Sequence, residues 1–319
     1  MRRIQVAHKC LLALRFENES EEKAKKGRTV NPLTQFKKIP ILQLLIALAL
    51  VARAAGTARA AISDFNGDGH PDYVLQNACT HQTAIWYLNN NVYIGSAWGP
   101  TLGWWFLVGA ADFNRDGHPD YVLLNSNNAP DTAIWYLSGR TFVGSAYGPS
   151  VPSGWGWVAT GDFNGDGHPD YVLYNPGTRQ TAIWYLNNNV YVSGGYGPTL
   201  PNGWALVGAA DFNRDGHPDY VLEHVTGQTA IWYLSGRTFV GSAYGPTVRS
   251  GWGWAGTADF NGDGNPDYVL YNADTRQTAI WYLNNNVYTG SAWGPTLPAG
   301  WSLVAAWCAP WDYGYGCCQ

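Results

Sequence analysis

The sequence predicts an all-β fold, a β-propeller of about five four-stranded blades. One nine-residue loop, D-F-N-x-D-G-x-P-D, recurs five times at spacings of 48, 50, 49 and 48 residues. Each period holds four short segments rich in β-branched and aromatic residues, separated by Gly, Pro and Asn turns and without helical periodicity. A period of roughly 40 to 50 residues with four strands is typical of a propeller blade.

The four strands follow one order in every period. A tryptophan-led run such as 204–208 precedes the acidic loop, and a Y-V-L run such as 220–222 follows it. After a variable turn comes T-A-I-W-Y-L, in all five copies, and then a short turn and a strand such as 190–192. A (W/Y)-G-P loop and a Gly-Trp pair lead into the next period.

The two ends of the repeat region predict how the ring closes. The first copy has only the short run 61–63 before its loop, whereas residues 301–305 form an extra strand with no loop after it. We expect this C-terminal strand to complete the first blade, which would leave no open sheet edge. An open array of blades, or a larger ring built from two chains, is the alternative.

The repeats alternate in sequence. Copies two and four share an arginine in the loop, Arg115 and Arg214, and the string S-G-R-T-F-V-G-S-A-Y-G-P. Copies one, three and five share L-N-N-N-V-Y. This alternation indicates duplication of a two-blade unit, and a closed ring of five would place two odd-type blades side by side.

The loops predict calcium sites. Each offers side-chain oxygens at positions 1, 3, 5 and 9 and the backbone carbonyl of position 7, with glycine at position 6 for a sharp turn. Oxygen ligands without nitrogen or sulfur suit a hard cation, so we expect about five Ca²⁺ ions, one per loop. The expected ligands are Asp64, Asn66, Asp68, His70 and Asp72; Asp112, Asn114, Asp116, His118 and Asp120; Asp162, Asn164, Asp166, His168 and Asp170; Asp211, Asn213, Asp215, His217 and Asp219; and Asp259, Asn261, Asp263, Asn265 and Asp267.

The loops are not EF-hands. An EF-hand has a bidentate glutamate at position 12 and flanking helices, whereas position 12 here is always leucine and the flanks are strands. The aspartate at position 9 is therefore expected to close the coordination sphere. Because Asn265 replaces the histidine found at position 7 elsewhere, we expect the site to use only the backbone there and the imidazoles to be solvated.

The charge distribution supports a cation. Beyond residue 60 the chain has seven arginines and no lysine against eighteen aspartates and one glutamate, a net formal charge of −12. Fifteen of these nineteen acids lie in the loops, three in each, where they repel one another unless a cation lies between them. The acidic body also argues against a nucleic-acid partner.

The loop motif D-x-N-x-D-G-x-x-D resembles the calcium-binding repeats of the FG-GAP/VCBS type, found in integrin-like β-propellers and many exported bacterial proteins. The resemblance covers about residues 61 to 307 but lacks an ordered Phe-Gly…Gly-Ala-Pro cassette. It implies a metal role for the loop residues and an adhesive role for the protein.

The first sixty residues predict export. Lys37 and Lys38 precede an apolar run, 39–52, and Ala58-Arg59-Ala60 matches the small-residue pattern of a signal-peptidase site. The run is too short for a comfortable membrane span. We expect cleavage after Ala60, a mis-annotated start upstream of the signal sequence, and a protein that is secreted or held at the cell surface, with no membrane span after cleavage.

The remaining chain is expected to hold the propeller, 61–307, and a Cys-rich tail, 308–319. Four cysteines remain after cleavage, an even number that favours disulfides in an exported protein. A bond from Cys79 to one of the C-terminal three would lock the closing strand, although Cys317 and Cys318 could pair between molecules. The expected cysteines are Cys79, Cys308, Cys317 and Cys318.

The sequence favours a binding module over an enzyme. It contains no nucleophile elbow, phosphate loop or zinc motif, and its one glutamate beyond residue 60 is Glu223. The aromatic before each Gly-Pro stands in a predicted loop, where its ring either stays exposed to stack on sugars or fill protein hot spots, or only caps the blade edge. These candidate ligand-binding residues are Trp98, Tyr147, Tyr196, Tyr244 and Trp293.

Three functions remain open from the sequence. Five equivalent sites on one ring would give avidity for a polysaccharide or glycoprotein, which is the first hypothesis. A protein–protein adhesion or scaffolding module is the second, and an uncharacterised extracellular hydrolase is the third.

Overall fold

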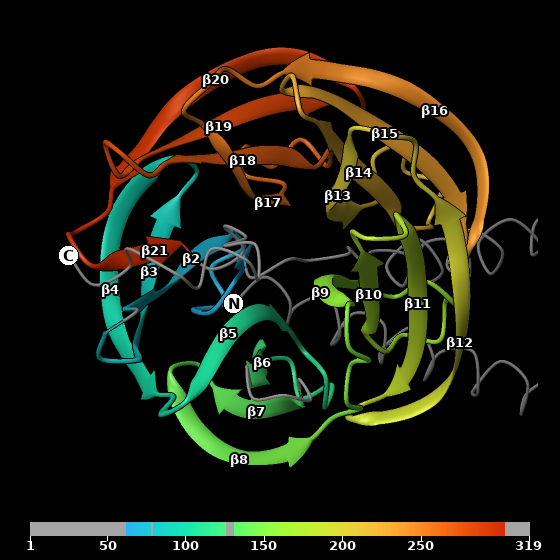
Figure 1. Ribbon diagram of the computed structural model, residues 1–319. Coiled ribbons are helices and arrows are strands. Elements are labelled where there is room, and N and C mark those ends of the chain that lie inside the picture. Colours follow the sequence, from blue (N-terminus) through green and yellow to red (C-terminus); the bar gives the residue numbers. More distant parts are fainter. Residues whose placement is uncertain (1–61, 78, 126–130, 304–319) are drawn as a thin grey trace, which may run out of the picture. The chain divides into compact units, whose positions relative to one another are not determined.

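The computed structural model describes residues 62–77, 79–125 and 131–303, which belong to one compact unit of the chain. These residues form antiparallel sheets arranged as the blades of a five-bladed β-propeller (Figure 1). They contain no helix, and so none long and apolar enough to cross a membrane. The predicted leader, the tail cysteines and residues 304–307 lie outside the described residues, and Cys79 is exposed in the turn after the second strand.

Blades 2 to 5 each consist of four consecutive strands, from the ring's centre to its rim. Blade 2 comprises β5 (Trp105–Ala111), β6 (Asp120–Asn125), β7 (Thr132–Ser138) and β8 (Thr141–Tyr147). Blade 3 comprises β9 (Gly156–Gly161), β10 (Asp170–Asn175), β11 (Gln180–Asn187) and β12 (Val190–Thr199). Blade 4 comprises β13 (Trp204–Ala210), β14 (Asp219–His224), β15 (Gln228–Ser235) and β16 (Thr238–Thr247). Blade 5 comprises β17 (Gly253–Ala258), β18 (Asp267–Asn272), β19 (Gln277–Asn284) and β20 (Val287–Thr296).

Blade 1 takes its innermost strand from both ends of the repeat region. It contains β1 (Ile62–Ser63), β2 (Asp72–Asn77), β3 (Gln82–Asn89) and β4 (Val92–Thr101), and β21 (Trp301–Leu303) joins it. The first half of β2 pairs with β1, and the second half pairs with β21 in the register Leu75 to Leu303. The predicted closure by the C-terminal strand is thus confirmed within one chain.

The hydrophobic core lies between the blades rather than inside one sheet. Each of five buried clusters joins two neighbouring blades, and one of them joins blade 5 to blade 1 through Phe260, Tyr73 and Leu303. The tyrosine after every loop meets the edge of the previous blade's loop phenylalanine, at centroid distances of 5.9 to 6.2 Å. This contact repeats across the seam as Phe260 to Tyr73, so all five interfaces are built alike.

The outermost strands differ from the sequence prediction. They run along the circumference in Figure 1 and, in all blades but the second, continue through the Gly-Pro pair to a threonine. The register between β3 and β4 shifts between the pairs Ala84–Trp98 and Gln82–Thr101. The Gly-Pro pair lies within this irregularity of β4. The candidate aromatics therefore lie in strands, and the prediction that they lie in loops was wrong.

The glycine of the Gly-Pro pair has a packing role. A Cβ on Gly99 would lie against the hydroxyls of Thr83 and Tyr121. Thr83 Oγ1 uses this space to donate a hydrogen bond to the carbonyl of Pro100 at 2.7 Å, and the other four blades repeat the bond. The motif thus fixes the outermost strand to the third.

Candidate functional site

Each acidic loop curls around its first aspartate. In the first loop Asp64 Oδ1 accepts hydrogen bonds from the amides of Gly67 and Asp68, at 2.7 and 3.1 Å, and Oδ2 accepts one from Gly69 at 2.8 Å. Gly69 has a φ of +93°, which a side chain would disfavour. The bonds to the amides of positions 5 and 6 recur in the other four loops.

The side chains at positions 3 and 5 lie beside this aspartate and bond to each other. Asn66 Nδ2 donates to Asp68 Oδ2 at 2.9 Å, and Asn66 Oδ1 accepts from the Asp68 amide at 3.0 Å. Asp68 Oδ1 accepts from the amide of His70 at 2.9 Å. All five loops share this network, so the structure brings the predicted residues of positions 1, 3 and 5 together.

The aspartate at position 9 is buried and braces the blade. Asp72 Oδ2 accepts from the amide of Phe65 at 2.9 Å, and Oδ1 accepts from the amide of Leu88 on β3 at 3.1 Å. The pKa of Asp72 is raised to about 7, chiefly by burial. Repulsion from Asp64 and Asp68 also raises this pKa, whereas the two hydrogen bonds lower it. The sequence analysis assigned this residue a metal role and missed its structural one.

The other four loops show the same arrangement. Burial raises the pKa of each position-9 carboxyl to about 7, while hydrogen bonds from the loop and from the third strand oppose the rise. These residues are Asp120, Asp170, Asp219 and Asp267. Loop and sheet are therefore tied together at the same point in every blade.

The loop donors fit calcium in kind. All are oxygens. The carboxylates lie near enough to repel one another, and a bound cation would relieve that repulsion. Among the described residues no three His, Cys, Asp or Glu side chains converge tightly enough to hold a metal by themselves. An ion in this loop would therefore draw on the side-chain oxygen of Asn66 and on a backbone carbonyl as well.

Arginines link the loops in pairs. Arg115 Nη1 of loop 2 lies 3.5 Å from Nε2 of His168 in loop 3, and its guanidinium packs on Gly167. Arg214 of loop 4 packs likewise on Gly264 of loop 5. The alternation of the repeats, visible in the sequence, thus becomes a contact between an even blade and the odd blade that follows it.

The candidate aromatics are exposed, and each meets a tryptophan that begins its blade's innermost strand or stands one residue before it. Their exposed fractions run from 61 to 72%. The pairs are Trp98 with Trp301, Tyr147 with Trp105, Tyr196 with Trp155, Tyr244 with Trp204 and Trp293 with Trp252, at centroid distances of 5.6 to 6.2 Å. The partner tryptophans were not predicted, although a Gly-Trp pair marks them in the sequence of every blade except the second, where Trp105 follows the pair.

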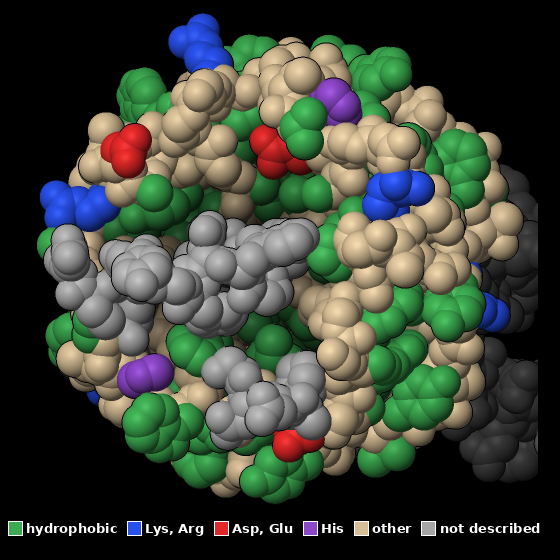
Figure 2. All heavy atoms as spheres, in the orientation of Figure 1, with side chains coloured by type: hydrophobic (Ala, Val, Ile, Leu, Met, Phe, Trp, Pro, Cys, Tyr) green, Lys and Arg blue, Asp and Glu red, His purple; other side chains and the backbone are tan. Residues whose placement is uncertain are grey.

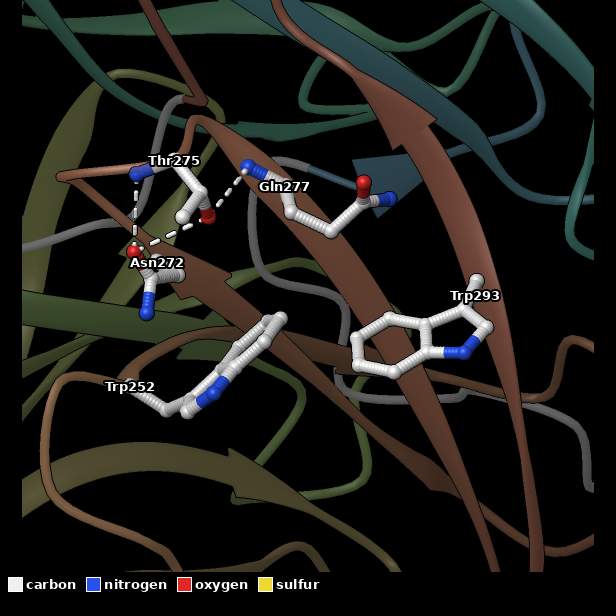
Figure 3. Close-up of a pocket in the computed structure, with 5 residues that line it drawn as sticks. All are labelled: Trp252, Asn272, Thr275, Gln277 and Trp293. Atoms are coloured by element: carbon white, nitrogen blue, oxygen red, sulfur yellow. Dashed lines mark hydrogen bonds between the residues drawn. The ribbon is translucent and has the colours of Figure 1, made fainter.

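One such pair forms the floor of an open pocket in blade 5. The pocket holds about 480 Å³ and is lined by Trp252, Trp293, Asn272, Thr275 and Gln277. Figure 3 shows the two indoles side by side, with the three polar side chains along one edge. Thr275 holds that edge together, because its amide and hydroxyl both donate to Asn272 Oδ1 and its hydroxyl accepts from the Gln277 amide.

The aromatic pockets and the acidic loops lie at opposite ends of the innermost strands. Trp105 begins β5, and the loop follows its last residue, Ala111. Because a seven-residue strand spans about 20 Å, the two sites lie on opposite faces of the ring. Figure 2 shows one face of the ring, on which hydrophobic side chains are numerous and acidic ones are sparse.

Comparison with known proteins identifies the repeats. The FG-GAP-like repeat model matches residues 64–123, 112–173 and 162–222. No curated protein matches the sequence.

Solved structures show weak similarity. One is a protein of unknown function from Bacteroides caccae, with 13% identity over 70% of this chain and 73% of that one and a TM-score of 0.38. Another is the Tc holotoxin pore of Photorhabdus luminescens, with 15% identity, a TM-score of 0.42 and coverage of 76% of this chain but 12% of that one. These likenesses carry no functional argument. The repeat matches and the five-bladed ring together show that the chain is an FG-GAP-repeat β-propeller.

Proposed function

We propose that this protein is an exported, calcium-stabilised, non-catalytic binding module that binds carbohydrate through its aromatic pockets. The observation that supports this best is the pair of aromatic rings found in every blade, one exposed and one half-buried, which in blade 5 is bordered by amide and hydroxyl groups. Aromatic faces stack on the apolar faces of sugar rings, and amides bond to their hydroxyls. Five sites on one ring would add avidity for a repeating polymer.

Calcium has a structural role in this proposal. The loops offer oxygen donors from clustered, mutually repelling carboxylates, and their position-9 aspartates brace the sheets. An ion in each loop would lower the repulsion and stabilise the folded state by linkage.

Export rests on the sequence of the first sixty residues and on the calcium sites, which suit an environment rich in that ion. Mass spectrometry of the protein secreted by its native host tests it. A mature chain that begins at Ala61 is the expected result, whereas an intact chain inside the cell would contradict export.

A protein partner is the second candidate. The outermost strands expose apolar side chains around the circumference, among them Val92 at 55%, Val192 at 62% and Val240 at 59%. Exposed apolar strands at a sheet edge favour protein contacts.

Glycan-array binding of the full chain in calcium tests the first proposal. Trp252→Ala should lose binding in blade 5, while Tyr288→Ala, on the same blade but packed on Trp281, should not. Equal binding by wild type and Trp252→Ala would locate the ligand elsewhere. A blank array from folded protein would favour the protein partner.

A further inference from the structure

We propose that the pocket of blade 5 and the matching aromatic pair and polar edge of blade 1, here called the blade 1 pocket, lie on either side of the seam where the ring closes and form one composite site for a chain of uncharged sugars. This inference rests on the proposed function and specifies which pockets dominate it and which ligand class they take.

The aromatic floors of these two pockets match each other and differ from the rest. Trp98 and Trp301 lie 5.6 Å apart at 41°, and Trp252 and Trp293 lie 5.6 Å apart at 40°. The other three blades pair a tryptophan with a tyrosine at 6.0 to 6.2 Å and at angles from 19 to 51°. An indole presents more surface than a phenol, so blades 1 and 5 offer the largest stacking platforms.

The polar edges of the two pockets are also the same. In blade 1 the Thr80 amide donates to Asn77 Oδ1 at 2.9 Å, and the Gln82 amide donates to Thr80 Oγ1 at 3.4 Å. Blade 5 repeats both bonds at the same distances, with Asn272, Thr275 and Gln277. The amide nitrogens of Asn77 and Asn272 donate no hydrogen bond within the described structure, and in Figure 3 that of Asn272 points toward Trp252. Both can donate to a ligand hydroxyl.

The even blades depart from this pattern. In blade 4 the ring of His224 replaces the asparagine and packs on Trp204 at 5.1 Å, which covers part of the platform. In blade 2 Asp131 replaces the glutamine and accepts a hydrogen bond from Ser150 at 2.6 Å, so a carboxylate stands at the pocket edge. Each change reduces what the pocket offers to a neutral sugar.

Blade 3 is intermediate. It keeps the same edge, with the Thr178 amide donating to Asn175 Oδ1 at 3.0 Å, but its second ring is Tyr196. We therefore rank it below blades 1 and 5 and above the even blades.

The lining of the blade 5 pocket indicates an uncharged ligand. None of its five side chains ionises near neutral pH. A charged ligand would lose hydration there without gaining a counter-charge, which is costly. A neutral sugar can stack its apolar ring face on the indoles and accept hydrogen bonds from amide donors through its hydroxyls.

The seam holds the two pockets in a fixed relation. Asn91 Nδ2 of blade 1 donates to the backbone carbonyl of Trp293 at 3.0 Å, and Tyr282 of blade 5 donates to Asn90 at 2.6 Å. The outermost strands β4 and β20 are also in contact. A polymer bound in one pocket therefore meets the other at high effective concentration.

Isothermal titration of the full chain in calcium tests the composite site. The probes are soluble mannan, hydroxyethyl cellulose, their disaccharides and polygalacturonate. We expect the affinity of at least one neutral polymer, expressed per sugar unit, to exceed that of its disaccharide by about 10-fold or more. Polygalacturonate should not bind. Trp98→Ala and Trp293→Ala should each remove that gain, whereas Tyr147→Ala and Tyr244→Ala, in the lower-ranked even blades, should each cause a smaller loss of affinity. All four side chains are exposed, and equal melting temperatures verify that the variants fold.

The outcomes separate the two claims. Equal losses in all four variants, or a preference for polygalacturonate, would overturn the composite site and leave a carbohydrate-binding ring in place. No binding of any sugar by the folded wild type would contradict the proposed function and this inference together.

Discussion

The two ends of the innermost strands differ in how closely the five copies of the repeat match one another. At the end that leads into the acidic loops, all five copies make the same hydrogen bond from the position-7 amide to the position-5 aspartate, and each position-9 aspartate is buried. At the other end the copies differ, with tryptophan or tyrosine in the outermost strand and asparagine or histidine at the end of the second strand. Uniformity suits a structural role, and variation suits recognition of a ligand.

Under the proposed function, stability and binding are assigned to opposite ends of these strands. A substitution at the loop end should change folding and metal affinity, whereas one at the pocket end should change ligand affinity alone. Four expectations test that separation.

Removal of calcium should have the largest effect. If each of five sites is filled at one hundred times its dissociation constant, linkage contributes about 2.7 kcal/mol per site. The sum, roughly 13 kcal/mol, is comparable to the whole stability of a typical domain, ~5–15 kcal/mol. We expect EDTA to lower the melting temperature by more than ~20 °C, measured by calorimetry. An unchanged melting temperature would show that the loops do not use calcium for folding.

Removal of one position-9 carboxylate should come next. Asp170→Ala leaves the buried amides of Phe163 and Leu186 without an acceptor, at about 1–3 kcal/mol each. Asp166→Ala, in the same loop but exposed, removes only the surface hydrogen bonds that the Asp166 carboxylate accepts from Asn164 Nδ2 and the His168 amide. In urea unfolding in EDTA at pH 6, Asp170→Ala should therefore have a lower free energy of unfolding than Asp166→Ala. Equal stabilities would mean that position 9 serves the metal alone.

The sequence was sufficient to predict the ring because its signals are local. The loop spacing predicted the number of blades, and the unmatched run at residues 301–305 predicted the closing strand, of which residues 301–303 pair with β2. The residues at loop positions 1, 3 and 5 converge because they are close in the chain and the loop curls around Asp64.

Long-range geometry was beyond the sequence. Trp252 and Trp293 lie 41 positions apart and meet because the antiparallel order β17-β18-β19-β20 puts the start of the first strand and the end of the fourth at the same end of the blade. The bracing role of Asp72 depends in the same way on Leu88, from a strand that the loop does not adjoin. Neither contact leaves a periodic signal in the sequence.

Glu223 should show a smaller effect. It occupies the position of Gln76, whose amide donates to Trp105 O at 3.0 Å and accepts from the Leu107 amide at 2.9 Å on the next blade. Burial raises the pKa of Glu223, so its ionisation is less favourable in the folded than in the unfolded chain. The stability gained from the neutral form is present below the unfolded pKa and is lost as pH rises through the folded one.

Glu223→Gln should therefore raise the melting temperature by a few degrees at pH 7.5 in calcium. The amide can form the two bonds seen at Gln76, and it avoids the cost of a buried charge. The gain should shrink by pH 4, where the carboxyl is neutral in both states. A gain that is equal at the two pH values would mean that ionisation has no part in it.

Substitution in a pocket should have the smallest effect on folding. Trp293 is 68% exposed, and its replacement by alanine removes little buried surface. Trp293→Ala should melt within a degree or two of wild type and bind calcium with unchanged affinity in a competition titration with a chromophoric chelator. A shift in calcium affinity would show that the two ends are coupled.

The most direct test of the separation is a crystal structure of the protein grown with calcium and soaked with a neutral oligosaccharide that it binds. We expect an ion in each acidic loop, with oxygens at about 2.3–2.6 Å, and the sugar stacked on Trp252 and Trp293 at the opposite end of the strands. A sugar whose hydroxyls coordinate a loop ion instead would contradict the account, because the loops would then be the binding site.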